Sequence, residues 1–164
     1  MTISQPDPSA QSAAQSTPPS AAQPTPSAPH PAPPPTGSLY YGLGFLAFIG
    51  IPFLSVITAG IVMAAIYPSA KKKGALAAEN ARQAANWGYT LILLTVLTVG
   101  GHFALLFAFT RDEPVSGFYP LGIPITLFVV VCVVHLVVII RGLVRAHHRE
   151  VSTNRLAIPF IRAS

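Results

Sequence analysis

The sequence predicts an all-α integral membrane protein with three transmembrane helices, a short interfacial helix and a disordered N-terminal tail rich in Pro, Ser and Ala. Only 9% of the 164 residues are charged, whereas 51% are hydrophobic. The charges are clustered and leave the stretches 8–70, 83–110 and 114–140 without a Lys, Arg, Asp or Glu. Each stretch contains an apolar run of about 20 residues, the length that crosses a hydrocarbon core. A soluble globular enzyme is therefore excluded.

Residues 1–38 are expected to form the disordered tail, and residues 39–164 the helical membrane domain. The tail is dominated by Pro, Ser, Ala and Gln and has almost no aromatic or branched apolar side chains. Such a segment buries too little apolar surface to offset the entropy lost on ordering. It also lacks the basic and apolar regions of a signal peptide, so it is expected to be a spacer.

The first span is predicted at residues 43–66. As one helix, these 24 residues would rise about 36 Å, which fits one crossing but not two. Pro52 removes one backbone donor in the first half and is expected to kink the helix or to start its regular part. Pro68 is expected to mark the end of the span.

The second and third spans are predicted at residues 87–109 and 121–140. The Ala-rich run 75–86 has strong helix propensity and is expected to be an interfacial helix leading into the second span. Trp87 and Tyr89 open that span, where their rings favour the headgroup level. The third span is rich in β-branched residues, but in a bilayer it must be helical because each backbone group needs a partner within the segment.

The distribution of positive charge predicts an orientation in the plasma (inner) membrane. Nine of the ten Lys and Arg residues lie between spans one and two or after span three. The positive-inside rule then places these segments and the C-terminus in the cytoplasm and the N-terminal tail outside. Six of these residues are expected to anchor the protein to anionic lipid headgroups. They are Lys71, Lys72, Lys73, Arg141, Arg145 and Arg149. The high pI reflects this topology, and no nucleic-acid partner is expected.

Small and hydroxyl residues at helical spacing predict where the helices pack. They are Gly60, Ala64, Gly88, Thr95, Thr98, Gly100, Ala104 and Ala108. In span two these residues form two stripes about 165° apart, which suits a helix lying between two neighbours. A contact between two copies of the chain would rest on the same residues.

His102 and His135 are the candidate intramembrane polar sites, because ionisable groups at this depth are functional candidates by default. His102 is predicted about 10 Å from the outer end of its span and His135 about 21 Å from the same side, so they are not expected to share a ligand. The favoured interpretation is a neutral imidazole that bonds an adjacent helix, and the alternative is a proton relay. No paired carboxylates, phosphate-binding loop, nucleophile motif or metal-ligand spacing is present, so no enzyme activity, metal or cofactor is expected.

The run at residues 79–87, ENARQAANW, resembles the signature of a bacterial family of small multi-pass membrane proteins of unknown function. That family is related to the Tic-twenty component of the chloroplast inner-envelope import machinery. Arg82, Ala84 and Asn86 match the signature and Trp87 replaces its Phe, whereas other positions depart. The resemblance covers about residues 42–162 and implies a helical membrane domain, but it transfers no activity. The plastid relative has four spans, against the three predicted here.

These observations favour a small, non-catalytic subunit or scaffold of a membrane complex. Its expected partners are the lipid bilayer and other membrane proteins or copies of itself. The alternative is a homo-oligomeric channel or proton-coupled carrier, in which His102 or His135 lines a path that one protomer is too small to enclose.

Overall fold

The structure is a computed structural model and describes residues 32–110 and 117–162. The chain divides into two units, Met1–Ala32 and Pro33–Ser164, and the fold described below is that of the second unit. The predicted disorder of residues 1–31 and most of the predicted connection between spans two and three lie outside the described residues.

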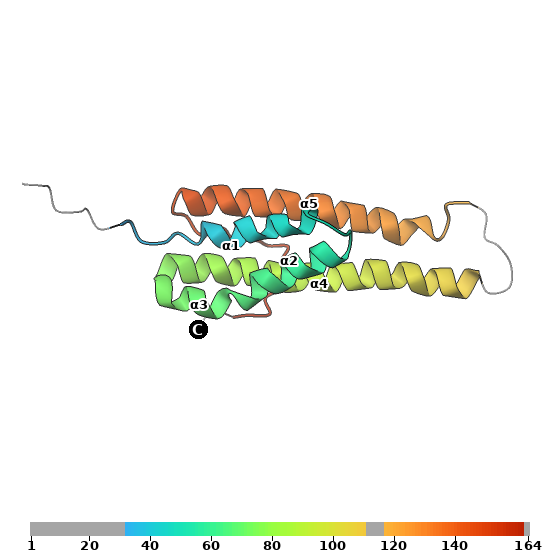
Figure 1. Cartoon of the computed structure of the whole chain (residues 1–164), viewed down its shortest axis with the longest axis horizontal. Coiled ribbons are helices and arrows are strands. Elements are labelled where there is room, and N and C mark those ends of the chain that lie inside the picture. The colour runs from blue at the N-terminus through green and yellow to red at the C-terminus, as the bar shows by residue number, and fades with distance from the viewer. Residues whose placement is uncertain (1–31, 111–116, 163–164) are drawn as a thin grey trace, which may run out of the picture. The chain divides into compact units, whose positions relative to one another are not determined.

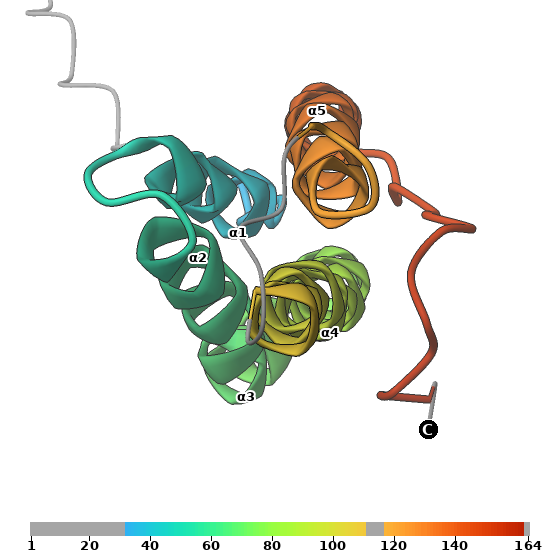
Figure 2. The same ribbon diagram turned by 90° about the vertical axis from the view of Figure 1, so that its right-hand side faces the viewer.

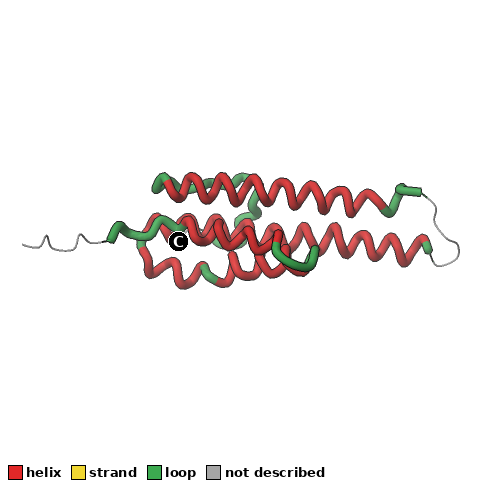
Figure 3. The backbone as a smooth tube through the Cα atoms, turned by 45° about the horizontal axis from the view of Figure 1, so that its top comes forward, coloured by secondary structure: helices red, strands yellow, loops and turns green. Residues whose placement is uncertain are grey.

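All regular elements in the described part of the chain are helices (Figure 3). They are α1 (Ser38–Gly42), η2 (Leu43–Phe48), α2 (Leu54–Ala65), α3 (Tyr67–Ala70), η3 (Lys71–Lys73), α4 (Ala75–Phe109) and α5 (Gly122–His147). Three continuous helical stretches are long and apolar enough to cross a membrane: Leu54–Lys73, Ala75–Phe109 and Gly122–His147. The predicted class, an all-α multi-pass membrane protein with three long apolar helices and an additional short one, is confirmed.

The predicted first span is not one continuous helix. Residues 38–70 form two antiparallel arms: α1 and η2 run one way along the bundle, and α2 and α3 run back (Figure 1). The turn between the arms has two residues in the left-handed region, Gly50 at φ 95° and Phe53 at φ 69°. Glycine adopts this conformation without steric cost. Pro52 lies between them, so it precedes the regular part of α2 rather than kinking a single helix.

The turn is closed by Ser55, in the first turn of α2. Its backbone N–H donates to the carbonyl of Ile51 at 3.0 Å, and its hydroxyl donates to the carbonyl of Ile49. Two carbonyls of the turn are thus bonded within the chain, which matters in a bilayer core where no water replaces a missing partner.

The turn stops short of the far end of the bundle. The helical residues before it, Ser38–Phe48, rise roughly 20 Å, less than the hydrocarbon core of about 30 Å. At the turn, Phe53 contacts the ring of Phe128 at 4.7 Å between centroids and packs in one cluster with Val99. Val99 precedes the end of α4 at Phe109 by ten residues, about 15 Å of helix.

The chain therefore returns to the end of the bundle from which it entered. The carbonyl of Thr36, before α1, accepts a hydrogen bond from the side chain of Asn80 near the start of α4, at 2.9 Å. Lys73 lines a shallow pocket together with residues 35–40. The predicted placement of the N-terminal segment and the Lys71–Lys73 loop at opposite ends is wrong. The short arm Ser38–Phe48 runs antiparallel to α2, so the chain before and after the hairpin lies at the same end of the bundle.

The run at residues 75–86 is helical and merges into the second span, as predicted. It forms the first turns of α4 and continues without a break into the second span. The run is Ala-rich and has no Pro or Gly, so nothing in it ends the helix. The separate short helix of this fold is the arm Ser38–Phe48.

Helix α4 packs against both α2 and α5, as Figure 2 shows along the bundle. Its contact with α2 is made by backbone at Gly60 and Gly88: a Cβ at Gly88 would lie 2.6 Å from the carbonyl oxygen of Gly60, and the reverse distance is 2.8 Å. Only glycine permits this approach. On the other side, the buried ring of Tyr41 lies over Gly142 of α5.

Candidate functional site

Buried polar residues gather at one end of the bundle, where α4 begins and α5 ends. The chain after α5 runs back along this end as an irregular segment, residues 150–162, which we call the C-terminal strap. It lies beside α4 and α5 (Figure 2). The residues of the first turns of α4 face this strap, so residues far apart in the sequence are joined there.

Asn80, which is fully buried, holds the start of the strap. Its amide nitrogen donates to the carbonyl of Glu150 at 3.0 Å and to the carbonyl of Thr36, and its oxygen accepts from the N–H of Ser152 at 2.9 Å. The hydroxyl of Tyr41 donates to the carbonyl of Ser152 at 3.2 Å. One amide side chain therefore ties together the segment before α1, helix α4 and the chain after α5.

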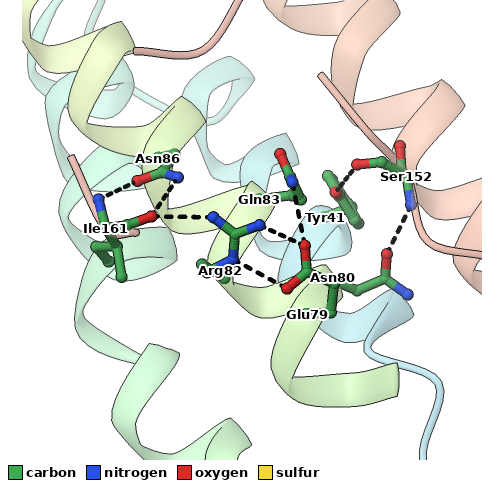
Figure 4. Close-up of polar contacts among 8 residues, drawn as sticks. All are labelled: Tyr41, Glu79, Asn80, Arg82, Gln83, Asn86, Ser152 and Ile161. Carbon is green, nitrogen blue, oxygen red and sulfur yellow. Dashed lines mark hydrogen bonds and ion pairs between the residues drawn. The ribbon is translucent and has the colours of Figure 1, made fainter. Parts of the chain in front are cut away.

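The end of the strap is held two turns further along α4 (Figure 4). The amide of Asn86 accepts from the N–H of Ile161 at 2.7 Å and donates to its carbonyl at 3.1 Å, which is the two-bond pattern of a paired strand. Arg82 donates to the same carbonyl at 3.0 Å. Thr90 accepts from the N–H of Ile158 at 2.9 Å.

Glu79 positions Arg82 for this contact. The two side chains form a two-bond ion pair one turn apart, and Gln83 donates to the same carboxylate at 3.2 Å. Glu79 lies eight residues before Trp87, in the charged first turns of α4 that precede the charge-free run 83–110. The hydrogen bond from the Arg82 guanidinium lowers the pKa of the Glu79 carboxyl, against a smaller opposing effect of burial.

His135 forms a second polar centre deeper in the bundle and is almost fully buried. The indole Nε1–H of Trp87 donates to its Nδ1 at 2.9 Å, so Nδ1 must be the acceptor. Its Nε2–H then donates to the carbonyl of Gly44 at 2.9 Å. The imidazole is therefore neutral, and both of its nitrogens are hydrogen-bonded. Through these bonds His135 joins η2, α4 and α5.

The other histidine, His102, lies apart from this centre. Its Nδ1 is 2.9 Å from the carbonyl oxygen of Leu121, at the start of α5, and its side chain is only partly buried. The two predicted intramembrane histidines therefore contact different segments and share no site. No group of three His, Cys, Asp or Glu side chains converges in the part of the chain that is described.

The predicted packing residues divide into a buried set and an exposed set, with Thr98 between them. Gly60, Ala64, Gly88 and Thr95 are buried between helices. Thr98 donates to the carbonyl of Leu94 in its own helix at 2.8 Å. The remaining residues, Gly100, Ala104 and Ala108, lie on exposed surface of α4, and a Cβ at Gly100 would meet no atom within 4 Å.

The predicted lipid anchors lie at the end of the bundle that holds the strap. Lys71, Lys72 and Lys73 form the exposed η3 turn before α4. Arg141, Arg145 and Arg149 are exposed along the last turns of α5 and just after it.

The sequence analysis missed the partners of Asn80 and Asn86. Both residues interrupt an Ala-rich run six positions apart, which signals two buried amides on one helix. Their partners are backbone atoms of the strap, and no side-chain pattern in residues 150–162 identifies those atoms in advance. Ala84 and Trp87, predicted as family-motif residues beside Arg82 and Asn86, are buried in the core around Tyr41.

One known protein family matches most of this chain. The model of the magnetosome magnetite crystal formation protein family, MamF/MmsF, matches residues 37–161, from the turn before α1 to the end of the strap. The chain belongs to the MamF/MmsF family. No curated protein and no solved structure matches it.

The MamF/MmsF match corrects the predicted resemblance to Tic-twenty-like proteins, which is wrong. The prediction rested on a short run, residues 79–87, whose polar members bind the strap and whose apolar members pack in the core. A local pattern set by these contacts does not identify a family, whereas the MamF/MmsF match extends over the whole bundle.

Proposed function

We propose that this chain is a non-catalytic structural protein of the magnetosome membrane, acting in the formation of the enclosed magnetite crystal. The family match from residue 37 to residue 161 carries this proposal. The hydrogen bonding supports it, because Asn80, Asn86, Arg82 and Thr90 all bind backbone of the chain itself. These side chains fix the C-terminal strap against α4, which is a structural role.

The surface offered to partners is the far half of α4. There Gly100, Ala104 and Ala108 form an exposed stripe of small residues, flanked by Phe103, which is 60% exposed. In a bilayer, small residues let another helix approach closely. We infer that this stripe contacts a second membrane protein or another copy of the chain.

We further infer that the end of the bundle with the strap faces the cytoplasm, so that the segment before α1 and the strap both lie on that side. Nine of the ten Lys and Arg residues belong to the segments at this end or adjoining it. The positive-inside rule favours a cytoplasmic location for them. In this orientation residues 1–38, which contain no Lys or Arg, do not have to cross the membrane.

The channel or proton-carrier alternative has less support. His135, its best candidate, has both ring nitrogens bonded within the protomer, to Trp87 and Gly44. A proton added at Nδ1 would displace the indole bond. No contact of His102 or His135 favours a permeation path.

The proposed role is tested by complementation in a magnetotactic bacterium that lacks its own MamF/MmsF protein. Expression of this chain is expected to restore crystal size, measured by electron microscopy. The variant Ala104→Leu/Ala108→Leu fills the stripe and is expected to fail at equal membrane abundance. The control Ala65→Leu/Ala75→Leu makes the same two substitutions at exposed positions outside the stripe and is expected to restore size. A wild-type chain that reaches the magnetosome membrane without changing crystal size contradicts the proposal.

A further inference from the structure

A pocket of about 570 Å³ lies between α5 and the C-terminal strap. One wall is a row on α5 in which every fourth residue faces the pocket, and the other wall is formed by residues 153–156 of the strap. The volume is in the range of small-molecule and cofactor sites. The pocket is partly open to the surface of the bundle, so a ligand can enter it from the bilayer.

The α5 wall changes from apolar to basic along its length. The row begins with Val133 and Val137 and continues with Arg141 and Arg145, over about 18 Å of helix. The valines lie toward the middle of the bundle, and the arginines toward the end that carries the strap. This order of surfaces is that of a lipid, with an acyl chain at depth and a charged headgroup at the interface.

The basic part of the pocket has little opposing charge. Arg155 of the strap adds a third guanidinium. In the described part of the chain, the ion pairs are Glu79 with Arg82 and Glu150 with Arg145, the latter at 3.9 Å between two half-exposed side chains. Arg141 and Arg155 take part in neither pair. Guanidinium groups bind phosphate oxygens through two parallel bonds, so this cluster matches a phosphate.

Asn154 supplies an unused donor in the same wall. Its side-chain oxygen accepts from the N–H of Leu156 at 3.0 Å, which fixes the orientation of the amide. Its Nδ2 atom is buried and has no hydrogen-bond partner within the chain. A buried donor without an acceptor is costly, and a ligand oxygen in the pocket would remove that cost.

We propose that this pocket binds one anionic phospholipid, with its phosphate at Arg141, Arg145 and Arg155 and an acyl chain along Val133 and Val137. The site requires only that the helices lie in a membrane, so it stands independently of the role in crystal formation. It differs from a diffuse basic anchor because it joins α5 to the strap, while Lys72 and Lys73 at the same end lie outside it.

The test is native mass spectrometry of the full-length chain in detergent, titrated with phosphatidylglycerol or phosphatidylcholine. The wild type is expected to retain one phosphatidylglycerol per chain in preference to phosphatidylcholine. Arg141→Gln/Arg155→Gln is expected to weaken this binding about 30-fold. Lys72→Gln/Lys73→Gln removes the same charge outside the pocket and is expected to leave it nearly unchanged. Equal loss in the two double variants, or equal retention of both lipids, overturns the proposal.

A second variant separates a lipid from a free phosphate ion. Val137→Trp fills the apolar part of the pocket at an exposed position and keeps all three arginines. It is expected to abolish retention of phosphatidylglycerol while its circular dichroism and elution volume remain those of the wild type. Unchanged lipid retention in this variant, or full displacement of the lipid by millimolar inorganic phosphate, would show that the site recognises phosphate alone.

Discussion

At the end of the bundle that carries the strap, α4 is bonded through its side chains to the segment before α1 and to the strap. In its far half, beyond Val99, the same helix has mostly exposed apolar side chains, and its side-chain bond to another element is that of His102 to Leu121. One end is fixed by buried amides within the chain, and the other is left to contact lipid or partners. A single 35-residue helix thus combines a bonded base with an exposed apolar half, where we propose that a partner packs.

The largest effect is expected from removing the amide that joins three segments. Asn80→Leu leaves the N–H of Ser152 and the carbonyls of Thr36 and Glu150 without their partner, which is expected to cost about 3 kcal/mol of unfolding free energy. The measurement is thermal unfolding in detergent. Gln83→Ala, which removes a single bond to Glu79, is the control and is expected to change stability little. Equal effects of the two changes would refute the role given to Asn80.

Two glycines of α4 compare the two halves directly. Gly88→Ala places a methyl group against the carbonyl of Gly60 and is expected to destabilise the fold by about 2 kcal/mol. Gly100→Ala meets open space and is expected to stabilise the helix by up to about 1 kcal/mol. Both values follow from the same unfolding assay. Destabilisation by Gly100→Ala in a monomeric preparation would mean that its stripe is packed within the chain.

The two histidines provide a third comparison, in which smaller losses of stability are expected. His135→Leu removes the bonds to Trp87 and Gly44 and is expected to lower stability by about 1.5 kcal/mol, because hydrogen bonds within a membrane contribute modestly. His102→Leu removes one bond in the far half and is expected to cost about 0.5 kcal/mol. The fluorescence of Trp87, the only tryptophan, reports the loss of its partner in the first variant alone. A spectrum unchanged by His135→Leu would contradict the indole bond.

The smallest effect is expected from pH. Because the pKa of Glu79 is lowered in the folded chain, its pairing with Arg82 stabilises the fold above the unfolded-state pKa and is lost as pH falls through the folded-state pKa. For a partly exposed pair, this loss is expected to be below about 1 kcal/mol between about pH 5 and pH 3. Glu79→Gln should remove that dependence in acid-unfolding curves. An identical slope in the variant would assign the dependence to another group.

The sequence was sufficient for the two long helices that cross the bundle, because charge-free apolar runs leave one solution in a bilayer. Pro124 does not interrupt α5, because it lies in the first turn of that helix. It was not sufficient for residues 43–66. An apolar run of that composition and length can form either one long helix or two short arms. Gly50 and Pro52 suit a turn as well as a kink. The choice is made by tertiary contacts, such as that of Gly44 with His135.

The site was predictable only in part. Asn86 was singled out as a residue of the family signature, and the structure gives it a different role, because its amide binds the backbone of Ile161. The importance of Asn80 and the path of the strap were not predictable, since backbone atoms of an irregular segment leave no residue pattern. Charge indicated the basic end correctly, yet charge alone does not show that the N-terminal segment reaches the same end.

The central claim is that the chain enters and leaves its first hairpin at one end of the bundle. Single cysteines at Ser20, Lys72 and Ser116, each with Cys132→Ala, test it through labelling by an impermeant maleimide in intact and lysed cells of a bacterial host that forms no magnetosomes, so that the chain lies in the plasma membrane. The account predicts that Ser20 and Lys72 positions are labelled only after lysis, whereas the Ser116 position is labelled in intact cells. Labelling at Ser20 in intact cells, together with Ser116 and not with Lys72, would contradict the hairpin and restore a single first crossing.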